Sequence, residues 1–440
     1  MTSISLNGSG AFLRATGSPS IVTRPDVLAE RYPQIGYDPN ACAVTVPTAQ
    51  SLARLSFVGI DARIVQLDTP SFVSAEVGQQ VIEAVKYLER RFPKNGLKDH
   101  LFNGDVHSLG SKWSPESKRA HSLLILSYPK FKRLGGNANS DALLAPIFHN
   151  GRSALDLLIA RDPEKGLRIV DKVTRFLGTE IYVDGKDEFG LSSWEYLAAV
   201  PDSVAIQKRE ALGGKIIGDY GISIPEVRDG KRGLRIASFA CGAGNMMCKL
   251  VPLLKAKGIN VDSIDNYDHD PVALAVARSH ADGSGIGNIV DTHLFNVLKR
   301  NPSKELKNLD VKEILGLFEY LDEVVGGRLA YELAGDFLHS LGKDMKPGSM
   351  ILFGNMVRSR PHQTMFNQVW PKLQQRSPEE VVELILSAGY PRDSIGVHMS
   401  DDGIYAEYTI KIPEGGLDLP RRSLRQILVK GPALRGIQDY

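Results

Sequence analysis

The chain has 440 residues, which predicts two or three domains at about 150 residues per domain. Its composition, 42% hydrophobic and 24% charged, is that of a globular protein. Its formal charge is only +2, so no overall field attracts nucleic acid. Three cysteines are too few for a disulfide framework or a four-thiolate zinc site. No apolar run of about 18 residues predicts a membrane span, and no secretory signal is evident. We therefore expect a cytoplasmic protein.

The N-terminal half of the chain divides into two predicted segments. Over residues 1–70, Gly and Pro interrupt every short apolar run, which predicts a poorly structured or extended segment. Residues 71–225 are expected to be mainly helical, and their last helix begins near Asp202 and ends near Tyr220. That helix leads into the next domain, where it either closes over a ligand as a lid or simply packs on the sheet.

From residue 226 to 413, predicted strands and helices alternate, which is typical of a parallel, doubly wound α/β sheet. Two final strands flank Asp401-Asp402-Gly403, a hairpin signal that adds one antiparallel strand. The basic tail, 414–440, is either solvated or a contact for an acidic partner. The expected strands cover 234–239, 260–267, 287–295, 312–318, 349–354, 394–399 and 404–412, and the expected helices cover 245–257, 272–280, 322–343 and 377–388.

A glycine-rich turn follows the first of these strands. Gly242 and Gly244 allow a ligand to approach the backbone, and Asp268 ends the next strand, where a carboxylate can accept both hydroxyls of a ribose. The dinucleotide pattern requires a third glycine where this chain has Met247, which argues against NAD. The pattern therefore predicts a site for a nucleoside without a pyrophosphate, or else a tight turn that binds nothing.

Residues 231–412 resemble a class I S-adenosylmethionine-dependent methyltransferase domain. The stretch 238–244, Ser-Phe-Ala-Cys-Gly-Ala-Gly, is similar to the first motif of that family, with Ser238 for the commoner acidic residue and Ala240 for the first glycine. The stretch 267–274 is similar to the second motif. Together with Gly-Leu-Phe-Glu-Tyr-Leu at 316–321, Gly354-Asn355 and Trp370, these motifs resemble a bacterial subgroup whose members form 3-hydroxy fatty acid methyl esters.

The resemblance implies a Rossmann-like methyltransferase fold, preceded here by a mainly helical domain, and S-adenosyl-L-methionine as cofactor. Phe318 has core packing as its alternative role, and Asn296 stands where an acidic residue often contacts the adenine. Cys241 is expected to pack inward rather than to act as a nucleophile. The cofactor-binding residues that the resemblance implies are Ser238, Ala240, Cys241, Gly242, Gly244, Asp268, His269, Asn296, Val297 and Phe318.

Candidate catalytic residues follow the fourth and fifth strands of the predicted sheet: Glu319, Tyr320, Asn355 and His362. Glu319 is a base, a partner for the amino-acid end of the cofactor, or a solvated carboxylate. Arg358 and Arg360 either clamp an anionic group of the substrate or lie in a solvated loop. The ten histidines contain no ligand spacing such as His-Glu-x-x-His, so no metal is expected.

Three functions remain open from the sequence. The first is methylation of a small-molecule or carrier-bound substrate, as in secondary metabolism. The second is attack at another carbon of the same sulfonium, by aminocarboxypropyl transfer or by cyclisation to azetidine-2-carboxylate with release of methylthioadenosine. The third is a nucleoside-binding module without catalysis. The sequence does not predict the oligomeric state.

Overall fold

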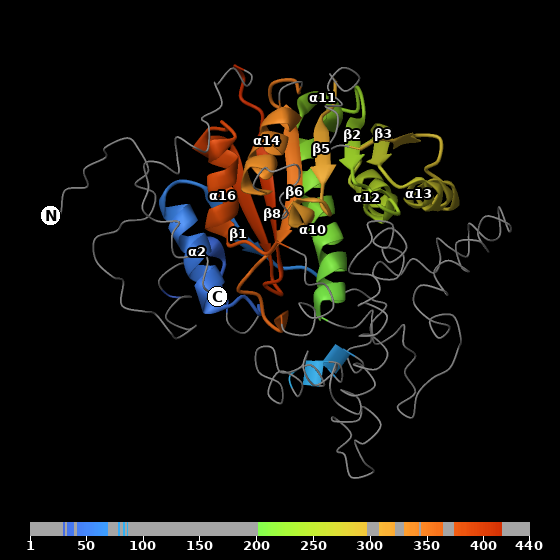
Figure 1. Cartoon of the computed structure of the whole chain (residues 1–440). Helices are drawn as coiled ribbons and strands as arrows, with labels where there is room; N and C mark the ends of the chain where they lie inside the picture. The colour runs from blue at the N-terminus through green and yellow to red at the C-terminus, as the bar shows by residue number, and fades with distance from the viewer. Residues whose placement is uncertain are drawn as a thin grey trace, which may run out of the picture.

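The computed structural model describes residues 33–38, 42–68, 201–296, 308–321, 330–342, 345–363 and 374–415, with isolated helical positions between 30 and 86. In these residues one eight-stranded sheet has the order β1-β7-β8-β6-β5-β2-β3-β4 (Figure 1). The strands are β1 (Asp61–Val65), β2 (Leu234–Phe239), β3 (Val261–Asp268), β4 (Val290–Leu294), β5 (Val311–Ile314), β6 (Met350–Met356), β7 (Ile395–Ser400) and β8 (Tyr405–Lys411).

Every neighbouring pair of strands is parallel except β8, which runs antiparallel to both β6 and β7. The hairpin that joins β7 to β8 turns at 401–403, with Gly403 at φ 71°. The strand order reverses at β2, because β3 and β4 extend the sheet on one side and β5 and β6 on the other. This arrangement confirms the predicted Rossmann-like α/β fold with an antiparallel strand inserted by the final hairpin.

Helices cover both faces of the sheet. One buried apolar cluster joins the strands to α10 (Pro201–Ser223), α11 (Pro225–Arg228), α12 (Asn245–Ala256) and α13 (Pro271–Gly283). The other joins them to α2 (Val46–Phe57), α14 (Ala330–Gly342) and α16 (Pro378–Ser387). Short 3-10 turns are η1 (Pro33–Ile35), η4 (Phe318–Tyr320) and η5 (Arg392–Ser394). No helix in the described part of the chain is long and apolar enough to cross a bilayer.

The prediction for residues 1–70 is wrong for 46–65, which form α2 and β1. β1 pairs in parallel with β7 and becomes the edge of the sheet, while α2 packs on α16. Ser51 and Arg54 of α2 both donate hydrogen bonds to the Glu379 carboxylate, with Arg54 Nη2 at 2.6 Å. A five-residue strand between turn residues is too short for its alternation to stand out locally, and its stability comes from the partner strand.

The predicted helix between Asp202 and Tyr220 is confirmed as α10, and among the described elements it packs on α12, β7 and β8. The predicted domain boundary near residue 225 stays a prediction. Almost all of 71–200 and the tail after residue 415 lie outside the described residues. The division of those segments stays a prediction.

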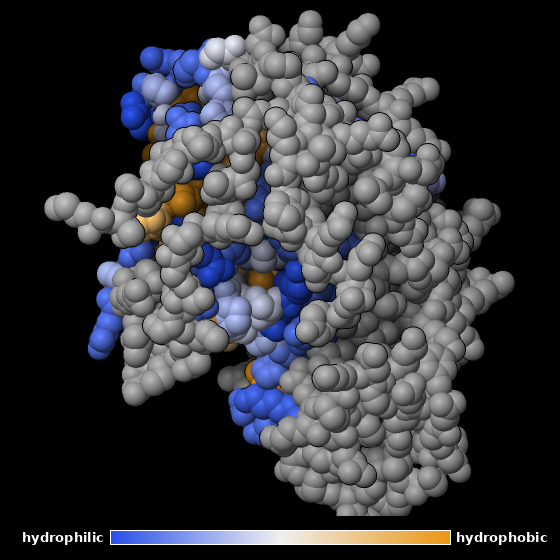
Figure 2. All heavy atoms as spheres, turned by 60° about the vertical axis from the view of Figure 1, so that its left-hand side comes forward, coloured by the Kyte–Doolittle hydropathy of each residue, from blue (hydrophilic) through white to orange (hydrophobic). Residues whose placement is uncertain are grey.

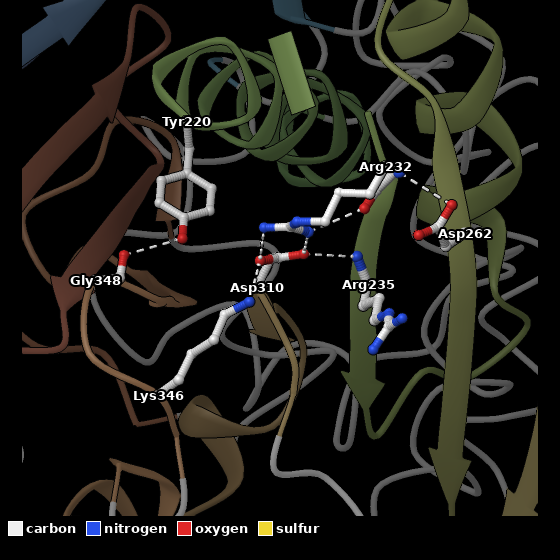
Figure 3. Close-up of polar contacts among 8 residues, drawn as sticks. Tyr220, Arg232, Arg235, Asp262, Asp310, Lys346 and Gly348 are labelled. Atoms are coloured by element: carbon white, nitrogen blue, oxygen red, sulfur yellow. Dashed lines mark hydrogen bonds and ion pairs between the residues drawn. The ribbon is translucent and has the colours of Figure 1, made fainter. Parts of the chain in front are cut away.

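A polar network ties the amino ends of the central strands together (Figure 3). Asp310, which is fully buried, accepts hydrogen bonds from Arg232 at 2.6 Å and from Lys346 at 2.6 Å. Burial raises the pKa of Asp310, but the hydrogen bonds from these two cations lower it more, so its net pKa lies below the ordinary value. Tyr220 of α10 donates to the carbonyl of Gly348 at 3.0 Å. These contacts fix the amino ends of the strands. Ligands bind at the other end of such sheets, the carboxyl edge.

On the face shown in Figure 2, hydrophilic residues cover most of the described area and hydrophobic residues form only small patches. Large apolar side chains with high exposure, such as Phe57 on α2 and Leu294 on β4, lie on different elements of the chain. Scattered apolar residues of this kind are normal on a monomer surface.

Candidate functional site

The turn between β2 and α12 holds three residues in the left-handed region, with Ala240 at φ 51°, Gly242 at φ 55° and Gly244 at φ 67°. A Cβ added to Gly244 would lie 3.1 Å from the Ala277 Cβ and 3.2 Å from the Asn266 Nδ2. Both the dihedral angle and the close approach therefore require glycine at 244. Gly244 caps the N-terminus of α12, where backbone N–H groups are available.

Asp268 lies directly beside this turn. Its Oδ2 accepts the Gly242 N–H at 2.9 Å, and its Oδ1 accepts the Asp270 N–H at 2.9 Å and lies 3.3 Å from the His269 Nδ1. Burial raises the pKa of Asp268, but hydrogen bonds from His269 and from the two amides lower it more, so its net pKa lies below the ordinary value. The ionised carboxylate keeps acceptor capacity for hydroxyl donors.

Buried polar atoms next to the turn lack partners. The side-chain amide of Asn245, directly after Gly244, is buried, and neither its oxygen nor its nitrogen has a hydrogen bond among the described residues. The same holds for Oδ1 of Asn266. Because buried polar groups are nearly always satisfied, these atoms, the left-handed turn and Asp268 together fit a polar ligand such as a nucleoside.

Glu319 is held in the η4 turn that follows β5. Arg376 donates to the carbonyls of Phe318 at 3.2 Å and Leu321 at 3.1 Å, and the Gln374 N–H donates to the Glu319 carbonyl at 2.7 Å. The Glu319 side chain is 2% exposed, so it is not the solvated carboxylate that the sequence allows. Burial raises the pKa of Glu319 to about 7, close to the pH at which a base works best.

Arg209 of α10 reaches the same place from the other side. Its Nη1 lies 4.0 Å from the Glu319 Oε1, and its guanidinium lies 4.9 Å from the centre of the Tyr405 ring. Glu407 of β8 is fully buried nearby, and its carboxyl oxygens have no hydrogen bond among the described residues. Neither Arg209 nor Glu407 was predicted from the sequence. Alternation along β8 places Glu407 on the strand face that carries polar residues, and this face is buried only because α10 packs over it.

Glu313 of β5 is the second missed carboxylate, and it connects the two halves of the site. It accepts a hydrogen bond from Ser238 of β2 and another from the Leu315 N–H at 2.7 Å. Burial raises its pKa. A charged Lys-Glu pair at 312–313 inside an otherwise apolar strand is the signal that could have identified it.

The segment after β6 is built around internal contacts. Asn355 is fully buried, its Nδ2 donates to the Gln374 carbonyl at 2.9 Å, and its Oδ1 has no partner among the described residues. Arg360 is buried in an ion pair with Asp202 at 2.8 Å, and Arg358 pairs with Glu380 at 2.9 Å. The solvated-loop hypothesis is therefore wrong for Arg360, and both arginines are already engaged within the chain.

The other candidates differ in how they are placed. Phe318 is fully buried, and its ring centre lies 4.7 Å from that of Phe353, which fits the core-packing alternative; its cofactor contact stays a prediction. Burial raises the pKa of the Cys241 thiol well above its usual value, which argues against a nucleophile. His362 is half-buried at φ 55°, His269 is half-exposed, and Asn296 is half-buried. Val297 and the side chain of Tyr320 lie outside the described residues.

No group of three or more His, Cys, Asp or Glu side chains within the described ranges is arranged to hold a metal ion. The site comprises the glycine turn, Asp268, the Ser238–Glu313 contact and Glu319. It lies at the carboxyl ends of β2, β3 and β5, around the strand at which the order reverses. That is where open α/β sheets bind ligands.

No protein-family model and no curated protein matches the sequence. Among solved structures, the chain is similar to the CMeT domain of the citrinin polyketide synthase, at 14% identity and a TM-score of 0.39, over 89% of this chain and 94% of that one. An O-methyltransferase family protein from Burkholderia thailandensis is 15% identical, with a TM-score of 0.35 over 59% and 73%. The N-methyltransferase NodS from Bradyrhizobium japonicum, with S-adenosyl-l-homocysteine, is 13% identical, with a TM-score of 0.31 over 47% and 88%. At TM-scores below 0.5, the fold assignment rests on the strand order and register described above.

Proposed function

We propose that this protein is an S-adenosylmethionine-dependent enzyme, and that it methylates a small-molecule or carrier-bound acceptor. The observation that carries the proposal is the left-handed turn at 240–244 joined to the Asp268 carboxylate at the switch point of the sheet. A low-pKa carboxylate beside a backbone that a ligand can approach suits a ribose. The absence of the third glycine of the dinucleotide pattern, at Met247, favours a nucleoside without a pyrophosphate.

S-adenosylmethionine, when bound, supplies an activated methyl group on a positively charged sulfur. In the proposed site, Asp268 orients the ribose, and the turn carrying Ser238, Gly242 and Gly244 receives the rest of the nucleoside. Ala240, Cys241, His269, Asn296 and Val297 are further proposed cofactor contacts, and all but Val297 lie in the described residues. Methyl transfer needs positioning above all, so a site fixed by buried hydrogen bonds suits it.

Glu319 is the proposed base. It would accept the proton that the acceptor loses when the acceptor's lone pair takes up the methyl group that S-adenosylmethionine supplies. The raised pKa of about 7 suits this role, because the carboxylate binds a proton near neutral pH. Asn355, whose Oδ1 has no hydrogen bond among the described residues, is proposed to orient the acceptor together with Tyr320 and His362.

Binding of S-adenosylmethionine to purified protein tests the proposal directly. We expect Asp268→Ala to weaken binding at least tenfold, because it removes the ribose acceptor, while circular dichroism stays that of a folded protein. Asp265→Ala on the same strand is the matched control, since Asp265 pairs with His293 away from the turn. Unchanged affinity in Asp268→Ala would contradict the assignment.

Product analysis separates the chemical alternatives. The protein is incubated with labelled S-adenosylmethionine, with and without a panel of hydroxy, carboxylic acid and amine acceptors. S-adenosylhomocysteine that forms only with an acceptor supports methyl transfer. Methylthioadenosine indicates attack at the aminocarboxypropyl carbon, by cyclisation if no acceptor is needed. Binding without either product supports the non-catalytic module.

A further inference from the structure

Beneath α10, three buried carboxylates surround one arginine. They are Glu313, Glu319 and Glu407 around Arg209, and we call this group the carboxylate cluster. The side chains come from β5 and the η4 turn that follows it, from β8 and from α10. Arg209 interacts electrostatically with each of the three, and its shortest ion-pair distance is the 4.0 Å to Glu319.

A glycine on β6 makes room for the cluster. Gly354 lies opposite Glu407 in the antiparallel register, and a Cβ on Gly354 would be 3.5 Å from the Arg209 Cδ and 3.4 Å from the Leu315 carbonyl oxygen. The arginine stem therefore lies over the bare backbone of β6, between β8 and β5. Its guanidinium extends toward Gly316, where a Cβ would be 3.9 Å from Nη2.

Carboxylates outnumber the cations at the cluster. Two cations, Arg209 and Arg376, act on three carboxylates, and Lys249 is already paired with the neighbouring Glu210 at 2.6 Å. The backbone of Met356 contacts Glu319 and that of Gly213 contacts Glu407, but none of the four carboxyl oxygens has a hydrogen bond of normal geometry within the described chain. Burying a carboxylate without a partner is costly, so an arrangement of this kind is completed either by protons or by a cation.

We propose that the carboxylate cluster is a binding subsite for an organic cation, and that its occupant is the positively charged sulfur of S-adenosylmethionine. The proposal rests on the proposed function. Two points favour this occupant. Glu313 accepts a hydrogen bond from Ser238, which begins the glycine-turn motif. Glu319, in turn, is the proposed base. A base that takes the acceptor's proton must lie within a few ångströms of the reacting methyl group, and therefore near the sulfur.

Proton release follows from this arrangement. Burial raises the pKa of Glu407 well above its usual value, that of Glu319 to about 7 and that of Glu313 above its usual value, against the lowering effect of Arg209. Other titratable or charged groups that interact with the cluster are Glu210, Tyr405, Tyr408, Cys241 and Arg376. An entering cation displaces protons to solvent. Binding then strengthens as pH rises, and the neutral sulfur of S-adenosylhomocysteine lacks this effect.

Isothermal titration calorimetry of the full chain at pH 6.5, 7.5 and 8.5, in two buffers of different ionisation enthalpy, tests the subsite. We expect S-adenosylmethionine to release protons and to bind up to about tenfold more tightly for each pH unit, as one linked proton gives. S-adenosylhomocysteine should bind with little pH dependence. At high pH it should therefore bind more weakly than S-adenosylmethionine, which favours product release.

Two variants assign the effect to the cluster. Glu319→Gln and Glu407→Gln should each weaken S-adenosylmethionine binding about tenfold or more, because a desolvated charge partner is lost, and should reduce the pH dependence. S-adenosylhomocysteine affinity should change less than about threefold. The control is Glu226→Gln on α11, an exposed glutamate at the opposite end of the sheet, which should change neither.

The possible failures are distinguishable. If the wild type binds S-adenosylmethionine but both variants bind it equally well, or lose both nucleosides equally, the sulfur subsite is overturned and the proposed function stands. If the wild type binds neither nucleoside, the proposed function fails, and this inference fails with it. Circular dichroism of each variant shows that a lost affinity does not reflect unfolding.

Discussion

At the scale of single residues, the most unusual backbone position of the site is Ala240. It has φ 51° where related motifs have glycine, and an L-residue in the left-handed region is strained. Ala240 directly follows β2, which is buried except at Arg235, so the packing of β2 fixes the start of the turn. The strain is thus local to the turn that we propose as the nucleoside site.

Ala240→Gly should raise the free energy of unfolding by about 0.5–1 kcal/mol. Glycine adopts this dihedral angle without steric cost, and the relief of strain exceeds the free-energy cost of its larger unfolded-state entropy. Urea unfolding followed by circular dichroism measures the change. Ala237→Gly in the middle of β2 is the control, and it should destabilise the protein because strand glycine loses packing and entropy. A lower stability of Ala240→Gly would show that the turn is not strained.

At the scale of elements, α10 determines which residues on one face of the sheet are buried. A Cβ on Gly213 would lie 3.0 Å from the ends of Leu315 and Met246 and 3.3 Å from the Glu407 Oε2, so the helix approaches the sheet closely at this residue. The next residue, Gly214, has only ordinary contacts, the nearest at 3.6 Å to Leu250. Two adjacent glycines in one helix thus have different packing.

This difference predicts opposite effects of the same substitution. Gly214→Ala should stabilise the protein by about 0.5–1 kcal/mol through helix propensity. Gly213→Ala should lose that gain and cost about 1–2 kcal/mol, because the added methyl overpacks the interface with β5 and α12. Thermal unfolding of both variants provides the comparison, and equal shifts would mean that α10 does not approach the sheet as closely as described.

At the scale of the whole molecule, an N-terminal segment completes the sheet. β1 lies at its edge and α2 packs on α16, so residues distant in sequence share one hydrophobic core. Leu52 of α2 is fully buried in that core, whereas Phe57 at the end of the same helix is 86% exposed. We therefore expect α2, β1 and the rest of the sheet to unfold as one unit.

Leu52→Ala should lower the free energy of unfolding by about 2–5 kcal/mol, since it leaves a cavity in a closely packed core. Phe57→Ala should change it by less than about 0.5 kcal/mol. Denaturant unfolding should show one transition in the wild type and in both variants. A separate early transition in Leu52→Ala would instead mean that α2 and β1 are an independent appendage.

Much of the fold was predictable, because the elements from β2 to β8 carry their own signals. Apolar runs such as 234–239 and turn residues such as Gly403 act over a few neighbouring residues, and the observed bounds differ from the expected ones by only a few positions in most cases. The proximity of Asp268 to the glycine turn was predictable too, since adjacent parallel strands end at one edge.

The remaining features depend on neighbours that are distant in sequence. The chain by itself determined the alternation of strands and helices and the left-handed glycine turn, because hydrophobic period and backbone freedom are local properties. Tertiary structure alone decided that β1 joins the sheet, that Arg360 is buried with Asp202, and that Arg209 meets Glu319 and Glu407 in an interior. Burial and the pairing of charges are properties of what packs around a residue, and only the folded chain brings those partners together.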